Sequence, residues 1–139
     1  MSVDSAGMAA RLGIKPGMVV QELGWDEDAD EDLRDSIIEA VGSDMVDEDT
    51  DEVADVVLLW WREDDGDLVD ALVDAIASLA DDGVVWLLVP KSGRPGHVEP
   101  GDVTEVAPTA GLSQTSSISA AKDWSGIRLV TPKTARTRR

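Results

Sequence analysis

The pattern of apolar positions is strongest between Val53 and Pro90, where two apolar runs flank an amphipathic segment. The runs at 54–61 and 84–90 are continuously apolar rather than alternating, which is typical of strands buried on both faces of a parallel sheet. The segment at 67–80 places apolar side chains at helical spacing, with acids on its other side. This order therefore predicts two parallel strands joined by a right-handed helical crossover.

Weaker patterns on both sides of this unit add further elements. Residues 18–23 predict a first strand, and residues 29–41 predict a helix with a narrow apolar stripe, acids in its first turn and Gly42 at its end. After the last apolar run, Asp102 predicts the cap of a short helix. Two segments of mixed polarity follow, and a tight turn at 123–126 joins them into an antiparallel hairpin.

Together these elements predict one α/β domain. Its fold class is a Rossmann-like three-layer sandwich, in which a mostly parallel sheet is closed by the C-terminal antiparallel hairpin. A length of 139 residues with 42% hydrophobic residues suits a single domain over 1–131, followed by a basic tail at 132–139 that we expect to be disordered. Met45 and Val46 could form the stub of a further strand, ahead of an acidic loop at 47–52.

The net charge of the chain limits the classes of partner that it can bind. It has 29 Asp and Glu against 12 Lys and Arg, a net charge of -17, and fifteen of the acids lie between Asp26 and Asp55. Because affinity for nucleic acids and anionic membranes depends on cationic contacts, we expect neither as a partner and expect instead a protein with a basic surface. The absence of cysteine, a single histidine and the lack of a membrane-spanning apolar run predict a cytoplasmic protein without a metal site.

Two segments of the apolar unit resemble the class I methyltransferase type of Rossmann fold. Residues 54–57, Ala-Asp-Val-Val, are similar to the start of that fold's fourth strand, and residues 79–90 are similar to its segment of leucine, turn, glycine, apolar strand and proline. More closely, the chain before the tail resembles a family of small bacterial proteins, the domain-of-unknown-function family numbered thirty fifty-two, on residues 12–18 and 124–130. The resemblance implies a trimmed methyltransferase-like fold and no assigned reaction.

The turn that would hold a methyltransferase cofactor departs from that pattern. In working members of the fold the cofactor lies on a glycine-rich turn after the first strand, where absent side chains let the backbone approach the ligand. Here only Gly24 remains, followed by Trp25 and by four acids within the next five residues. The acid that would bind the ribose hydroxyls has no firm counterpart. We therefore expect no cofactor, and in particular no binding of S-adenosylmethionine.

The carboxyl ends of the predicted strands form the first candidate site, because ligands of open parallel sheets bind there. Those ends carry two aromatic and three cationic side chains: Trp25, Trp61, Arg62, Lys91 and Arg94. An aromatic wall with three cations could hold a nucleotide or an acidic peptide. The alternative is that the tryptophans only pack the core and its rim.

The acidic helix at 29–41 offers a second candidate surface. The side chains that we expect to face a partner are Asp30, Glu31, Asp35 and Glu39. Against this stands the simpler interpretation that the acids only keep the protein soluble. Elsewhere, His97 beside Glu99 could serve in acid–base chemistry, and the carboxylates at 26–28 could bind a hard cation, but a solvated loop and a helix start explain both.

We therefore interpret the chain as a non-catalytic interaction or regulatory protein on a degenerate methyltransferase-like scaffold. Two alternatives stay open. One is a sensor that binds a small molecule or nucleotide in the crevice at the carboxyl ends of the strands. The other is an active S-adenosylmethionine-dependent methyltransferase. No complete catalytic motif surrounds the apolar core, so no catalytic residue is assigned.

Overall fold

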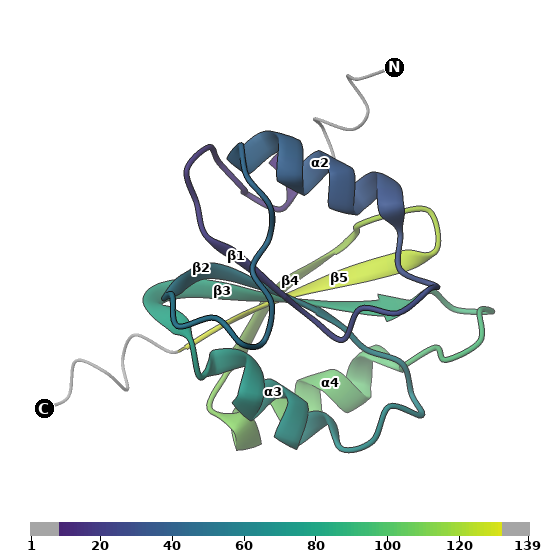
Figure 1. Ribbon diagram of the computed structural model, residues 1–139. Helices are drawn as coiled ribbons and strands as arrows, with labels where there is room; N and C mark the ends of the chain where they lie inside the picture. The colour runs from purple at the N-terminus through teal and green to yellow at the C-terminus, as the bar shows by residue number, and fades with distance from the viewer. Residues whose placement is uncertain (1–8, 132–139) are drawn as a thin grey trace, which may run out of the picture.

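The structure, a computed structural model, describes residues 9–131 and has helices on both faces of one mixed sheet (Figure 1). The strands are β1 (Val20–Leu23), β2 (Ala54–Trp60), β3 (Leu79–Pro90), β4 (Ser113–Ser119) and β5 (Trp124–Val130). The helices are α2 (Glu31–Val41), α3 (Leu68–Ile76) and α4 (Pro100–Val106), which runs into a 3-10 helix at Ala107–Ala110. The predicted tail at 132–139 lies outside the described residues.

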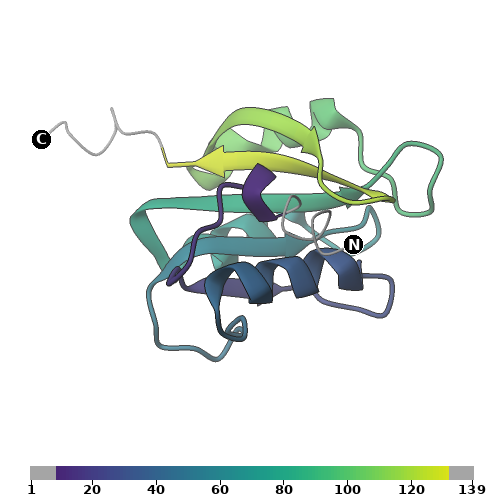
Figure 2. The same cartoon turned by 90° about the horizontal axis from the view of Figure 1, so that it is seen from above.

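The sheet has the strand order β1-β2-β3-β5-β4. Strands β1, β2 and β3 are parallel, while β5 is antiparallel to both of its neighbours. Helix α2 covers one face, and α3 with α4 covers the other (Figure 1). Figure 2 shows α2 beside the short helical turn at 9–11, on the same face of the sheet. The predicted fold class, a mostly parallel α/β sandwich closed by a C-terminal hairpin, is confirmed.

Alternate residues of the central strands bury two separate apolar clusters. Along β2, Val56, Leu58 and Trp60 pack on the side of α2, whereas the residues between them pack on the side of α3 and α4. Trp61 belongs to the second cluster, so the neighbouring tryptophans occupy opposite faces. Burial on both faces explains why these runs are continuously apolar.

Helix α2 ends at the predicted residue and begins two residues later than predicted. Asp30 is the N-cap, and its carboxylate accepts a hydrogen bond of 2.9 Å from the Leu33 amide. Gly42 takes the left-handed conformation, with φ of 89°, that ends the helix. Leu33, Ile37 and Val41 are buried in the cluster beneath the helix. The acids of α2 are therefore left on its solvent side.

Val46 is the remnant of a strand at the outer edge of β1. It forms an isolated parallel bridge to Gln21. Its carbonyl accepts a hydrogen bond of 2.8 Å from the Glu22 amide, and its own amide donates to the Val20 carbonyl at 2.9 Å. The predicted stub is confirmed at this residue, and the acidic loop at 47–52 follows it beside the carboxyl end of β1.

The boundary between α3 and β3 differs from the predicted one. The helix ends at Ile76 rather than Ala80. The strand begins at Leu79 rather than Val84. The reason is that the chain pairs with the start of β2 directly after the helix, where Leu79 aligns with Ala54 ahead of an irregularity in register. Leu79 fits the apolar spacing of a helix and of a strand alike, so the pattern could not separate them.

Two further boundaries also differ from the predicted ones. Helix α4 has Glu99 as its N-cap, so the predicted cap residue Asp102 lies within its first turn. Strand β5 begins at Trp124, inside the predicted turn at 123–126, because Trp124 pairs with Pro90 of β3. Pairing with a neighbouring strand has outweighed the local preference of these residues for a turn.

Leu58 and Leu87 are fully buried, one in each apolar cluster. We predict that Leu58→Ala or Leu87→Ala lowers the free energy of unfolding by about 2–5 kcal/mol, because each change removes buried contacts and leaves a cavity. Urea titration measures this loss. Val53→Ala, at an exposed position before β2, is the control and should cost less than about 0.5 kcal/mol. A loss well under about 1 kcal/mol for either leucine would contradict the central place of these strands.

Candidate functional site

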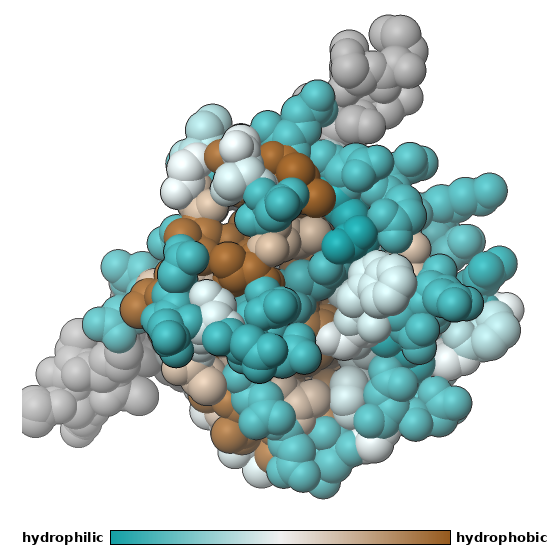
Figure 3. Space-filling model, viewed as in Figure 1, coloured by the Kyte–Doolittle hydropathy of each residue, from teal (hydrophilic) through white to brown (hydrophobic). Residues whose placement is uncertain are grey.

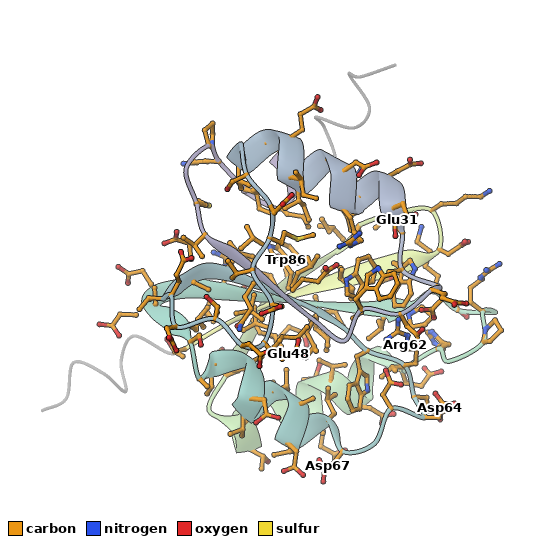
Figure 4. The ribbon with its side chains drawn as sticks, in the orientation of Figure 1. Glu31, Glu48, Arg62, Asp64, Asp67 and Trp86 are labelled. Atoms are coloured by element: carbon orange, nitrogen blue, oxygen red, sulfur yellow. The ribbon has the colours of Figure 1, made fainter. Side chains whose placement is uncertain are left out.

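The carboxyl ends of β1, β2 and β3 meet at one end of the sheet, where three loops follow them. These loops span residues 24–30, 61–67 and 91–99. Figure 4 shows Arg62 among these loops and Glu48, from the acidic loop, beside α3. All five predicted crevice residues lie in the three loops, so this end of the sheet is the candidate site.

Arg62 joins the first two loops through a buried guanidinium, and the residue is 8% exposed. Its Nε donates to Asp28 Oδ2 at 3.0 Å, and its Nη2 donates to the other oxygen of the same carboxylate. Its Nη1 donates to the Gly24 carbonyl at 2.7 Å, to Asp65 Oδ2 at 3.2 Å and to the Trp60 carbonyl at 3.3 Å. The bidentate pair with Asp28 is the strongest kind of contact that an arginine makes with a carboxylate.

The apolar parts of the Arg62 side chain are also covered. Its guanidinium carbon lies 5.2 Å from the centre of the Trp124 ring, within the range of a cation–π contact. Gly96 approaches the stem so closely that a Cβ there would lie 3.0 Å from the Arg62 Cβ. The Gly96 carbonyl also accepts a hydrogen bond of 2.9 Å from the Glu63 amide. Arg62 thus holds together the loops after β1, β2 and β3.

The charges around Arg62 shift the pKa of the paired groups. The hydrogen bond from Arg62 holds the pKa of the Asp28 carboxyl below its ordinary value of 3.8, against a smaller opposing effect of burial. Burial by itself lowers the pKa of Arg62, but hydrogen bonds and charge interactions with Asp28 and Asp65 together outweigh it, and the net shift is upward. At neutral pH the Arg62–Asp28 contact is therefore an ion pair.

A second ion pair lies on the α2 face of β1. Glu22 accepts two hydrogen bonds from the Arg34 guanidinium of α2, at 2.6 and 2.8 Å, and one from the Trp60 indole at 2.9 Å. The hydrogen bond with Glu22 raises the pKa of Arg34 above its usual range. Arg34 also bonds Glu31 at 3.0 Å and lies 5.8 Å from the centre of the Trp25 ring. This network fixes α2 against β1 and positions Trp25.

Gly24 is the one glycine left in the turn after β1, and packing inside the protein explains why a glycine is needed there. Its φ is 75°, and a Cβ at this position would collide with the carbonyl oxygen of Trp60. That oxygen and the Gly24 carbonyl both accept hydrogen bonds from Arg62. The glycine therefore lets the end of β1 pack against β2, a role that needs no ligand.

A groove of about 550 Å³ lies between β1, the carboxyl end of β2 and α3. Its lining includes Trp25, Trp61 and Arg62. Trp25 is 49% exposed, whereas Trp61 is buried. The structure thus brings together three of the five predicted crevice residues.

Lys91 and Arg94 lie away from this groove and bind other partners. Lys91 Nζ donates to Ser119 Oγ at 2.6 Å, and Arg94 pairs with Asp123 at 3.4 Å. Both partners belong to the β4–β5 hairpin, which lies beside β3 because β5 pairs with it. The three predicted cations therefore do not converge, and the one that lines the groove is already paired.

Sequence reasoning missed most of the groove lining, including the polar residues Gln21, Glu48 and Asp74. Gln21 is 3% exposed, which is unusual for a polar residue. Gln21 and Glu22 interrupt the apolar run of the predicted first strand, and this interruption is the signal that could have found Gln21. Glu48 and Asp74 carry no such signal, because they are two of many acids in the chain.

The predicted interaction residues all belong to α2 or to its cap. Glu31, Asp35 and Glu39 are exposed, whereas Asp30 is half-buried because its carboxylate caps the helix. Figure 3 shows hydrophilic side chains over most of this view, interrupted by apolar side chains where β1 and β2 lie. Asp30 therefore has a structural role, and the other three acids form an exposed surface.

His97 and the carboxylates at 26–28 form no metal-binding cluster. His97 Nδ1 lies 2.9 Å from the Pro90 carbonyl, and its Nε2 lies 3.3 Å from Glu99. Between residues 9 and 131 no group of three His, Cys, Asp or Glu side chains could hold a metal ion. Over the same described range, no helix is long and apolar enough to cross a membrane.

The chain is similar to bacterial proteins that have no known function. A family model described as "Protein of unknown function (DUF3052)" matches residues 9–133. The uncharacterized protein Rv2239c of Mycobacterium tuberculosis is 57% identical over 129 residues, which are 93% of this chain and 81% of that protein. The uncharacterized protein Mb2263c of Mycobacterium bovis matches with the same identity and coverage.

Solved methyltransferase structures share the fold at low sequence identity. A SAM-dependent methyltransferase from Aquifex aeolicus matches with a TM-score of 0.62 and 13% identity, over 91% of this chain and 88% of its own. The pyocyanin biosynthetic protein PhzM matches with a TM-score of 0.68 and 13% identity, over 92% of this chain and 54% of its own. This chain therefore spans about half the length of PhzM. The likeness shows a methyltransferase-like fold and says nothing of activity.

The residues after β1 do not fit the cofactor of that fold. A ligand on this turn needs exposed backbone N–H groups and room above a glycine. Here Arg62 bonds the Gly24 carbonyl, and Asp28 from the same turn pairs with Arg62. A cofactor that took the place of the guanidinium on this turn would leave these partners unpaired.

We predict that Arg62→Met lowers the free energy of unfolding by about 2–3 kcal/mol, because two carboxylates and two carbonyls lose their donor. Asp28→Asn should cost about 1 kcal/mol, since that carboxylate is half exposed and can be hydrated. The double variant should reveal a coupling of about 1 kcal/mol between the two residues. Urea titration of the wild type, the two single variants and the double variant at neutral pH measures this coupling.

The same coupling should depend on pH through Asp28. Because Arg62 depresses the pKa of Asp28 in the folded protein, the ion pair adds its full stability only above the ordinary pKa of 3.8. As the pH falls through the lower pKa of the folded state, Asp28 is protonated and the coupling disappears. A coupling that is absent at neutral pH, or that does not fall as the pH is lowered below 3.8, would contradict the pair.

Proposed function

This chain belongs to the DUF3052 family of proteins of unknown function, and we propose that it is a non-catalytic interaction or regulatory protein on a degenerate methyltransferase-like scaffold. The observation that carries the proposal is the Arg62 cluster, which consists of Arg62, Asp28, Asp65 and the carbonyl of Gly24. In this scaffold a cofactor would lie on the turn that the cluster closes. The Arg62 cluster stabilises the fold at the turn where a cofactor would otherwise bind. We therefore infer that this chain has retained the fold without the cofactor.

The charge of the molecule supports a partner with a basic surface. The net charge is -17, and Glu31, Asp35 and Glu39 follow one another along the exposed side of α2. The helix is held in place by its caps and by the Arg34–Glu22 pair, so these charges have fixed positions. Fixed charges steer the approach of an oppositely charged protein and select it over others. A cytoplasmic location is part of this proposal, and nucleic acids and anionic membranes are excluded as partners by repulsion.

The groove beside β1 supports a second candidate function, that of a small-molecule sensor. Its volume of about 550 Å³ lies within the range of ligand pockets. Four carboxylates line it, those of Asp26, Glu48, Asp65 and Asp74. Among the described lining residues only Arg62 is cationic, and it is paired. The phosphates of a nucleotide would be repelled, which restricts this candidate to neutral or cationic ligands.

We predict that the protein binds neither S-adenosylmethionine nor S-adenosylhomocysteine with a dissociation constant below about 1 mM, because binding would break the Arg62 cluster. Isothermal titration calorimetry measures this, with a working methyltransferase as the positive control. Micromolar affinity for either compound would contradict the proposed function and favour the methyltransferase alternative.

We predict that neutralising the acids of α2 abolishes capture of the protein partner and leaves the fold intact. The variant combines Asp30→Asn, Glu31→Gln, Asp35→Asn and Glu39→Gln. Asparagine caps a helix as well as aspartate does, so α2 should remain folded by circular dichroism. Pull-down from native lysate with identification by mass spectrometry measures capture. Added salt should weaken capture by the wild type, because the screening length falls to about 3 Å at 1 M salt.

A matched control removes four exposed acids elsewhere, with the changes Glu63→Gln, Asp64→Asn, Asp102→Asn and Glu105→Gln. This control should capture the same partner as the wild type. Equal loss in both variants would show that net charge alone acts, against a specific surface. Unchanged capture by the α2 variant would move the interaction to the groove lined by Trp25, Trp61 and Arg62.

A further inference from the structure

We propose that the groove between β1 and α3 receives an arginine side chain of the partner protein. This inference rests on the proposed function and names the place and the chemistry of one contact. It depends on three features of the groove within residues 9–131: a buried acceptor without a donor, carboxylates without an ion pair, and an exposed indole. With a volume of about 550 Å³, the groove has room for a guanidinium and its stem.

The wall of the groove contains an unpaired hydrogen-bond acceptor. Gln21 lines the groove and is 3% exposed. Its amide nitrogen donates to the Asp47 carbonyl at 3.1 Å, which fixes the orientation of the amide. Its amide oxygen, Oε1, has no hydrogen-bond partner within the described residues. A buried acceptor without a donor costs free energy, so a ligand that brings an N–H group to it is favoured.

The carboxylates of the groove select a cation. Arg62 is neutralised by Asp28 and Asp65. Glu48 and Asp74 line the groove from the acidic loop and from α3, and neither forms an ion pair within residues 9–131. A cation in the groove would be attracted by both carboxylates at short range, whereas an anion would be repelled.

Trp25 gives the groove an aromatic surface that suits a planar cation. The residue is 49% exposed, and the Arg34 guanidinium lies 5.8 Å from the centre of its ring. A guanidinium stacks on an indole and presents five donors in a fixed fork, whereas an ammonium is a compact charge. Acceptors on separate elements beside an exposed indole therefore favour arginine over lysine.

The partner in the groove is a second protein rather than the chain's own basic tail. Every residue that lines the groove lies within the segment 9–133 that the family shares. Three of the four cations of the tail, Arg136, Arg138 and Arg139, lie beyond that segment. The groove therefore belongs to the family fold, while most of the tail's charge does not.

The test is an NMR titration of the isotopically labelled full chain with the peptide acetyl-Gly-Arg-Gly-amide. The readout is the indole N–H signals of Trp25 and Trp61, which line the groove. The indoles of Trp86 and Trp124 donate hydrogen bonds inside the protein, do not line the groove and serve as internal controls. We expect saturable shifts of the two groove signals only. The citrulline peptide, which has the same shape without the charge, should bind at least about tenfold more weakly.

Variants test each feature separately, and circular dichroism checks the fold of each one. Gln21→Met keeps the size of the side chain and removes Oε1, and it should weaken binding of the arginine peptide about tenfold. Glu48→Gln combined with Asp74→Asn should weaken it by at least as much. The matched control, Asp102→Asn with Glu105→Gln, changes two exposed acids away from the groove and should leave the affinity within about twofold.

Four outcomes would overturn the inference. They are equal binding of the citrulline peptide, equal loss in the groove variant and the Asp102/Glu105 control, tighter binding of free agmatine than of the peptide, and movement of the Trp25 signal on deletion of residues 132–139. The third would assign the groove to a small cation and the fourth to the tail. If the arginine peptide does not bind but the α2 variant still fails to capture the partner, this inference is wrong and the proposed function is kept. If α2 neutralisation leaves capture unchanged, the proposed α2 surface falls instead.

Discussion

The guanidinium of Arg62 ties three loops at the carboxyl ends of the parallel strands into one unit. It is bonded to Asp28, Asp65 and two backbone carbonyls, and it is covered by Trp124 and Gly96. Because an arginine remains charged wherever a protein is folded, burying it requires permanent partners. Those partners belong to the turn that would otherwise meet a cofactor. The interaction that stabilises this end of the sheet therefore also holds the turn on which a cofactor of this fold would lie.

The trimmed sheet leaves two exposed surfaces on either side of β1. The strand outside β1 is reduced to the bridge at Val46, and the α3 side of β1 borders a groove. On the opposite face, the Arg34–Glu22 pair holds α2 with its acids toward solvent. The groove and the α2 surface both carry excess negative charge, which supports the proposed recognition of a basic protein.

The sequence predicts the core of this fold well because burial on both faces of a strand leaves a continuous apolar run. The start of β3 and the hairpin turn depend on pairing between strands, which local patterns do not contain. In the site, Trp25, Trp61 and Arg62 could be expected together because they follow adjacent strands. The burial of Arg62 could not, since its partners Asp28 and Asp65 look like any other acids in the chain.

The central claim is that the Arg62 guanidinium is buried and bonded to the turn after β1. The rate at which its Nε–H exchanges with solvent tests this claim most directly. This group can be followed as an arginine Nε–H signal in a nitrogen–proton NMR spectrum, with Arg62→Lys to assign it. A guanidinium bonded as described should give a signal that exchanges slowly with solvent and does not move when millimolar S-adenosylhomocysteine is added. A signal that exchanges as fast as those of exposed arginines would contradict the claim that the Arg62 cluster holds the turn after β1. A signal that shifts and loses protection when the compound is added would also contradict it.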